Sequence, residues 1–166
     1  MTTPPLSRDI GRAERAMGAL LEPLLVKASL SFPEWTVLVF LDGDGPLTSD
    51  ELVRRQVGGR VAPEAMARAA VDGLRSRDLL APTDEARGAG GPGGVEEPRL
   101  VPTAAAEAAY RPVRRTVDRI IDGLYGDLPP ADLEATHRTL AEVVRRANAR
   151  LAAGDLGAGA IHLLKG

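Results

Sequence analysis

Hydrophobic and polar positions alternate with a helical period along most of the chain. Three short segments, residues 33–41, 49–57 and 63–74, carry apolar residues at three- and four-residue intervals. A longer segment with a broad apolar stripe precedes them, and two long segments follow from residue 104 onward. The helical period is lost between residues 79 and 102. The pattern predicts a mainly α protein with a small β-hairpin.

Two capping boxes mark the starts of the first two short helices. Ser31 is followed three residues later by Glu34, and Thr48 by Glu51, a spacing at which side chain and backbone cap each other reciprocally. Pro33 falls in a first helical turn, where a missing N–H costs nothing. Three short helices followed by a hairpin are typical of a winged helix-turn-helix, which places its third helix in a DNA major groove.

The segment after the third short helix has the composition of a hairpin at a sheet edge. Two extended pieces, about residues 80–83 and 99–102, flank a Gly-rich stretch that contains Arg87. Pro82 and Pro102 exclude a central strand because proline cannot donate to a ladder. We therefore expect a wing with a flexible tip.

The last helix carries a narrow apolar seam of the coiled-coil type, which requires a partner helix. Its positions are Leu133, His137, Leu140, Val144, Ala147 and Leu151. Together with the broad stripe near the N-terminus, this seam predicts that the two ends of the chain pack together and against a second copy. We expect one domain, 1–166, with dimerisation helices at 7–28 and 104–152, a winged helix-turn-helix at 32–102 and a flexible tail at 153–166.

Composition narrows the possible chemistry. The chain has no cysteine and a net charge of −2, which excludes disulfides and thiolate metal sites. Residues 48–100 contain eight Arg and nine Asp plus Glu. A basic surface there therefore requires the arginines to lie together and the acidic side chains to point elsewhere. No apolar run approaches the about 18 residues of a membrane span, and no leader pattern begins the chain. We expect a soluble, cytoplasmic protein without membrane contact.

No motif indicates catalysis, a metal or a cofactor. The stretch 88–93 matches a nucleotide-binding glycine pattern by letter, but no buried strand precedes it and no helix follows it. The acids around Asp44 lack the spacing of a calcium loop. His137 lies on the apolar seam and His162 in the tail, so no nucleophile with a general base can be assembled. We expect a protein that is not an enzyme.

The large side chains leave two interpretations open. Met17, Phe32, Trp35, Phe40 and Tyr110 supply either ordinary packing between helices or an apolar effector pocket. In the second case Arg15 adds a polar group beside it. The residue types alone do not separate the two.

Five segments in order resemble the multiple-antibiotic-resistance regulator (MarR) family of winged-helix proteins. They are residues 30–38, 45–52, 71–80, 99–105 and 128–133. The resemblance implies a homodimeric transcriptional repressor that binds a pseudo-palindromic DNA operator and responds to a small, often aromatic ligand. It also implies the DNA-contacting positions, which are Thr48, Ser49, Arg60, Glu64, Ala65, Met66, Arg68, Ala69 and, in the wing, Arg87.

The expected recognition helix departs from the family pattern. It is rich in alanine and offers Arg68 alone for bidentate base contact. An alternative therefore stays open: a dimeric binding module of the same fold that has lost operator recognition and acts through a protein partner or by sequestering a ligand.

Overall fold

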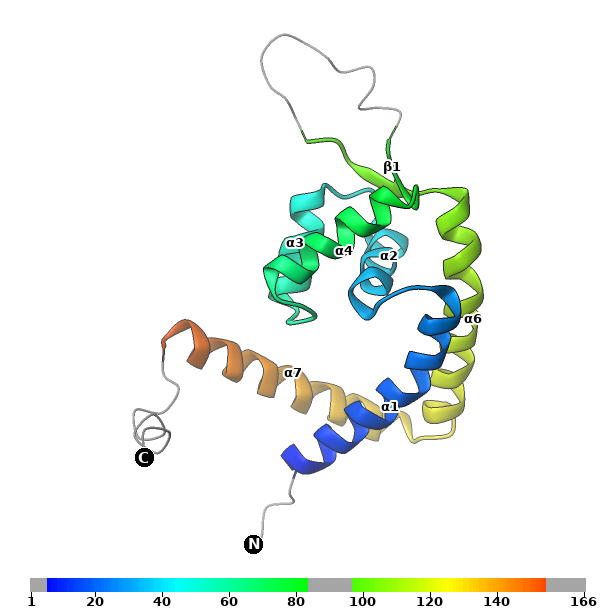
Figure 1. The fold of residues 1–166 in the computed structure, drawn as a ribbon. Coiled ribbons are helices and arrows are strands. Elements are labelled where there is room, and N and C mark those ends of the chain that lie inside the picture. Colours follow the sequence, from blue (N-terminus) through cyan, green and yellow to red (C-terminus); the bar gives the residue numbers. More distant parts are fainter. Residues whose placement is uncertain (1–5, 84–96, 155–166) are drawn as a thin grey trace, which may run out of the picture. The chain divides into compact units, whose positions relative to one another are not determined.

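The computed structural model describes residues 6–83 and 97–154. Within these residues the chain forms six helices and one two-stranded antiparallel sheet (Figure 1). The elements in chain order are α1 (Leu6–Ala28), α2 (Phe32–Asp44), α3 (Ser49–Gly58), α4 (Glu64–Ser76), β1 (Leu80–Pro82), β2 (Leu100–Pro102), α6 (Ala104–Tyr125) and α7 (Pro130–Ala152). The predicted mainly α fold with a hairpin wing is confirmed. The predictions for the wing tip and for most of the tail concern residues 84–96 and 155–166, which lie outside the described residues.

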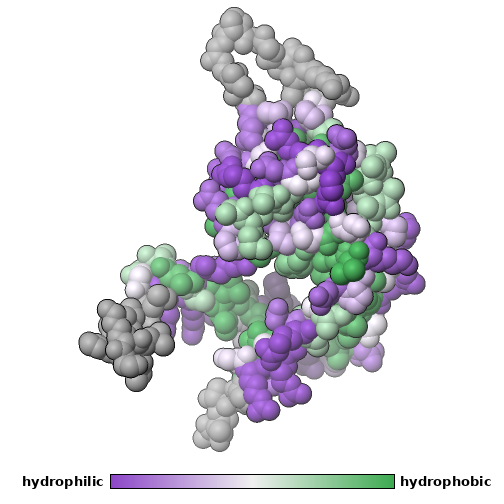
Figure 2. All heavy atoms as spheres, in the orientation of Figure 1, coloured by the Kyte–Doolittle hydropathy of each residue, from purple (hydrophilic) through white to green (hydrophobic). Residues whose placement is uncertain are grey.

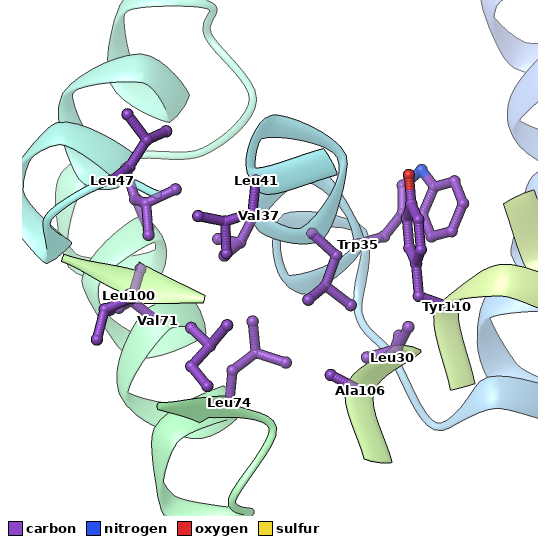
Figure 3. Packing of buried hydrophobic residues seen from close by; sticks show 14 of the residues in the cluster. Leu30, Trp35, Val37, Leu41, Leu47, Val71, Leu74, Leu100, Ala106 and Tyr110 are labelled. Carbon is purple, nitrogen blue, oxygen red and sulfur yellow. The ribbon is translucent and has the colours of Figure 1, made fainter. Parts of the chain in front are cut away.

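The chain divides into two compact units, Met1–Asp118 and Arg119–Gly166. The first unit contains α1 to α4, the hairpin and most of α6, and the second contains the end of α6 and α7. The hydrophobic core belongs to the first unit, where Leu74 and Leu100 are almost fully buried (Figure 3). Leu38 and Leu52 are buried to the same degree. Helices and hairpin of the winged helix-turn-helix thus share one core.

Both predicted capping boxes are present. The backbone N–H of Ser31 donates to Glu34 Oε2 at 2.8 Å, and that of Thr48 donates to Glu51 Oε2 at 2.8 Å. The bond from the Thr48 backbone is the main reason that the pKa of Glu51 lies below its ordinary value. Each cap satisfies N–H groups that the first turn of a helix leaves without partners, so α2 and α3 begin where local sequence dictates.

The hairpin is joined to the helix-turn-helix by its second strand. Leu80 pairs with Pro102 and Pro82 with Leu100, and the N–H of Leu100 donates to the carbonyl of Leu47, just before α3, at 2.8 Å. The Leu100 side chain is 1% exposed. The base of the wing is therefore fixed to the segment that precedes α3.

One buried polar side chain interrupts the core. Gln56 on α3 is fully buried, and neither atom of its amide has a hydrogen-bond partner among the described residues. A buried amide without partners costs about 1–3 kcal/mol. The contact of α3 with the core is therefore weaker than its apolar neighbours Leu52 and Val53 would make it.

Arg77 joins three segments of the first unit. Its guanidinium donates to the carbonyl of Ser29 at 2.8 Å, to Glu34 Oε1 at 2.6 Å and to the carbonyl of Gly73 at 3.2 Å. Ser29 has a φ of 54°, a left-handed conformation that a non-glycine residue adopts at a cost. The C-terminal end of α4 thereby holds the turn between α1 and α2.

We expect Arg77→Ala to lower the free energy of unfolding by about 1–3 kcal/mol, because it removes hydrogen bonds that involve a charged group. Urea denaturation followed by circular dichroism measures the change. Arg75→Ala, an exposed position two residues earlier in the last turn of α4, is the matched control and should change stability by less than about 0.5 kcal/mol. Equal effects of the two substitutions would show that the Arg77 contacts do not stabilise the fold.

Candidate nucleic-acid interface and apolar pocket

Helix α4 has one buried face and one exposed face. Ala67, Ala70, Val71 and Leu74 are buried against the core, at the three- and four-residue spacing of an amphipathic helix. α4 packs against both α2 and α3. The small side chains of Ala67 and Ala70 allow close packing of α4 on the core. The opposite face of α4 is exposed to solvent.

The exposed face of α4 contains the side chains for which we predicted base contacts. Glu64, Ala65, Met66, Arg68 and Ala69 are all exposed, and Met66 is 56% exposed despite being hydrophobic. Exposure of these five side chains on one helix is what a recognition helix requires.

The structure brings some predicted residues from different elements into one groove of about 610 Å³ between α3 and α4. Thr48, Glu64 and Arg68 line it, together with Asp50 and Glu97. Ser49 begins α3 beside Thr48, whereas Arg60 follows α3, exposed and with a φ of 56°. Arg87 lies outside the described residues.

Arg68 is held by two carboxylates. Its Nη2 lies 3.1 Å from Glu64 Oε1, one turn earlier on α4, and its Nη1 lies 3.3 Å from Asp50 Oδ1 on α3. The hydrogen bonds to Glu64 and then to Asp50 raise the pKa of Arg68 above its ordinary value. All three side chains are more than half exposed, so the ion pairs add little to stability. They orient the guanidinium instead.

Sequence reasoning missed the role of Asp50. We considered the acids of this region only as calcium ligands and as members of capping boxes, and in α3 the box is made by Thr48 and Glu51. Asp50 faces Arg68, which is 18 residues away along the chain. Only the packing of α3 on α4 brings the two together, so no local signal could have found the pair.

Other arginines near this surface are also paired with acids. Arg55 forms an ion pair with Asp44. Arg99, at the base of the wing, lies 3.4 Å from Glu51 Oε2 and donates to the carbonyl of Pro46 at 3.0 Å. Part of the near balance of charge in residues 48–100 therefore consists of neighbouring ion pairs, whereas Arg54 donates to the carbonyl of Asp50 at 3.3 Å.

A second, apolar pocket of about 660 Å³ lies between α1 and α2. Met17, Leu21, Leu25 and Leu30 line it together with Phe32, which is 50% exposed. The charged side chains of its lining are Glu14 and Glu22, and no basic residue is among them. The pocket therefore suits an apolar group without a negative charge.

The predicted ligand-binding residues separate into two groups. Met17 and Phe32 line this pocket, whereas Trp35 and Tyr110 are 6% exposed and pack against each other in the core, with ring centroids 4.9 Å apart (Figure 3). Arg15 is exposed on α1 and is not part of the lining. Packing thus accounts for Trp35 and Tyr110, whereas ligand binding at the pocket beside Met17 and Phe32 stays a prediction.

Tyr110 connects α6 to α2 through a partly buried hydrogen bond. Its hydroxyl donates to Asp42 Oδ2 at 2.9 Å. Burial, and then the hydrogen bond to Asp42, raise the pKa of Tyr110 to about 12. The phenol is therefore neutral at physiological pH and acts as a structural donor.

Three further observations concern the part of the chain that the structure describes. Taken singly, none of the described helices combines the length and the hydropathy needed to cross a membrane. Residues 6–83 and 97–154 contain no group of three His, Asp or Glu side chains that could hold a metal ion. His137 is exposed on α7.

Comparison of the sequence with protein-family models and with curated proteins finds no match. Comparison of the structure with solved structures finds many, and we report three. A MarR family transcriptional regulator from Silicibacter pomeroyi is 18% identical, with a TM-score of 0.65 over 86% of this chain and 89% of that one. NadR in complex with 4-hydroxyphenylacetate is 17% identical, with a TM-score of 0.64 over 87% and 95%.

The third is BpsR of Bordetella bronchiseptica, whose DNA binding is regulated by 6-hydroxynicotinic acid. It is 18% identical, with a TM-score of 0.62 over 86% of this chain and 95% of that one. The matches span nearly the whole length of these proteins. The chain therefore has the fold of the MarR family transcriptional regulators, as the resemblance in sequence implied.

We expect Asp42→Asn to lower the pKa of Tyr110 from about 12, because the amide carries no charge to oppose the phenolate. Burial should still keep it above the ordinary value of about 10. Phenolate absorbance measured between about pH 9 and 12 in a Tyr125→Phe background isolates Tyr110, since the chain has two tyrosines. An unchanged titration would show that Asp42 does not act on the phenol.

The sign of the effect on stability follows from the same shift. The pKa is higher in the folded state than in the unfolded state, so the contribution of Tyr110 to stability is complete below about pH 10. It is lost as the pH rises through about 12. Tyr110→Phe should remove this alkaline loss, which thermal unfolding across the same pH range would measure.

Proposed function

We propose that this chain is a homodimeric, ligand-responsive transcriptional repressor that acts in the cytoplasm and binds a pseudo-palindromic DNA operator. The observation that carries the proposal is α4, whose exposed face offers Glu64 and Arg68 beside the N-terminus of α3. The fold shared with transcriptional regulators supports the same conclusion. We propose no catalytic activity.

The contacts with DNA divide into two kinds. Arg68, with Ala65 and Ala69 beside it, would face base edges in the major groove, since a guanidinium reads guanine and short methyl groups contact thymine. Thr48 and Ser49 would contact phosphates. The Thr48 oxygen already accepts from the N–H of Glu51 at 3.2 Å, which leaves its hydroxyl hydrogen for a phosphate oxygen.

Exposed apolar side chains support a dimer. No residue of α7 is buried in the single chain, and Leu140, Val143, Val144 and Leu151 are each at least 39% exposed along it. Figure 2 shows hydrophobic atoms on this helix beside hydrophilic ones. We propose that α7, with the exposed apolar residues of α1, packs against a second copy and so places two recognition helices on two half-sites.

The pocket between α1 and α2 is our proposed effector site. NadR is in complex with 4-hydroxyphenylacetate, and the DNA binding of BpsR is regulated by 6-hydroxynicotinic acid, both of them aromatic acids. In this chain Glu14 and Glu22 are the charged side chains of the lining, and they would repel a carboxylate. We therefore propose an aromatic effector that is neutral or positively charged.

A second candidate function is a dimeric binding module of this fold without operator recognition. The pairing of Arg68 with both Asp50 and Glu64 favours it, because a guanidinium neutralised within the protein attracts phosphate less. Such a module would act through a protein partner or by sequestering a ligand.

Operator binding is tested by gel shift with the DNA upstream of the gene. We expect Arg68→Ala to weaken binding about tenfold or more, because it removes a bidentate base contact. Arg111→Ala, which removes an exposed arginine of α6 paired with Glu107, is the matched control for charge and should bind as the wild type does. If the folded wild-type dimer shifts no DNA, the second candidate replaces the first.

Effector charge is tested with two phenols that differ in one group. We expect 4-hydroxyphenethylamine, a cation, to raise the melting temperature more than 4-hydroxyphenylacetate at equal concentration, because only ligands that bind the folded state stabilise it. Replacing Glu14 and Glu22 by Gln should abolish the difference, while Glu107→Gln should not. Stronger stabilisation by the acetate would contradict the proposed charge preference.

A further inference from the structure

We propose that Glu64 and Arg68 together read one G·C base pair in each half of the operator, with Arg68 on guanine and Glu64 on cytosine. The inference rests on the DNA binding proposed above and adds to it the identity of a base pair and a role for an acidic side chain. Glu64 would otherwise be only a repulsive charge in a DNA interface.

The exposed face at the start of α4 offers few polar groups. Residues 64–70 read Glu-Ala-Met-Ala-Arg-Ala-Ala, so Glu64 and Arg68 are the polar side chains of its first two turns. Their neighbours Ala65 and Ala69 are too short to form hydrogen bonds with bases. Any hydrogen-bonded readout by this segment therefore depends on Glu64 and Arg68.

The two side chains form a unit before DNA is present. Glu64 Oε1 lies 3.1 Å from Arg68 Nη2, and Asp50 Oδ1 on α3 lies 3.3 Å from Arg68 Nη1. A guanidinium has five N–H donors, so three remain for a base. Asp50 is a positioning residue, because it holds Arg68 from a second helix while the Glu64 carboxylate keeps an oxygen free to accept.

The order of groups on a base pair selects the sequence. In the major groove a G·C pair presents two adjacent acceptors, N7 and O6 of guanine, followed by the N4 donor of cytosine. An arginine fork requires two adjacent acceptors, and a carboxylate requires a donor. O6 and N4 are hydrogen-bonded to each other at about 2.9 Å, close to the 3.1 Å between Glu64 and Arg68.

An A·T pair does not fit the same unit. Its donor, N6 of adenine, lies between the acceptors N7 and O4. The fork would meet a donor, and the carboxylate would meet an acceptor or the thymine methyl group. Because Asp50 and Glu64 bring two negative charges to the one positive charge of Arg68, general attraction to phosphate does not compensate for such a mismatch.

The test is selection from random DNA duplexes with the full-length dimer, which requires no known operator. We expect the wild type to enrich sites with an invariant G·C pair in each half. Glu64→Ala should reduce the preference at that one position about tenfold and leave the others unchanged. Glu64→Gln should reduce that preference less than Glu64→Ala does, because the amide keeps an oxygen that can accept from N4 of cytosine but loses the charge.

Asp72→Ala is the matched control, since it removes an exposed acid two turns further along α4. It should raise affinity for all duplexes alike and keep the G·C preference. If Glu64→Ala behaves in the same way, Glu64 acts by general repulsion and the inference is overturned while the proposed function stands. If the folded wild type enriches no sequence, both the inference and operator binding fail.

Discussion

The close packing of α4 on the helices behind it is the constraint on which the rest of the structure depends. Ala67 and Ala70 face the core beside Val71 and Leu74, and small side chains at these positions allow a close approach of helices. A helix with one buried face has its outward residues fixed by the period of 3.6. The same packing therefore decides that Glu64, Arg68 and their alanine neighbours face solvent, and it brings Asp50 of α3 to Arg68.

Much of the fold could be predicted because its signals are local. The capping boxes at Ser31 and Thr48 lie within four residues of the groups that they satisfy, and the prolines at the hairpin act on their own backbone. The apolar intervals predicted a helix at residues 63–74 in the same way. Such features need only neighbouring residues, and for that reason a single sequence reveals them.

The remaining features depend on contacts between distant residues. Arg77 reaches Ser29 across 48 positions, and Gln56 is buried although its residue type favours the surface. Among the aromatic side chains, Phe32 borders a pocket whereas Trp35, three positions later, packs on Tyr110. All are large and apolar, so their type could not assign them. Only the position of each on its helix relative to other elements separates a pocket wall from the core.

Pairing of the arginines has a consequence for ionic strength. Arg55, Arg68 and Arg99 each contact a carboxylate of the same unit, so a phosphate that takes one of them displaces a fixed acid. The steep loss of affinity with salt that characterises many DNA-binding proteins reflects cations released from DNA by unpaired basic residues. If the proposed DNA binding holds, these three arginines would therefore add less to the salt dependence of binding than arginines without a carboxylate partner.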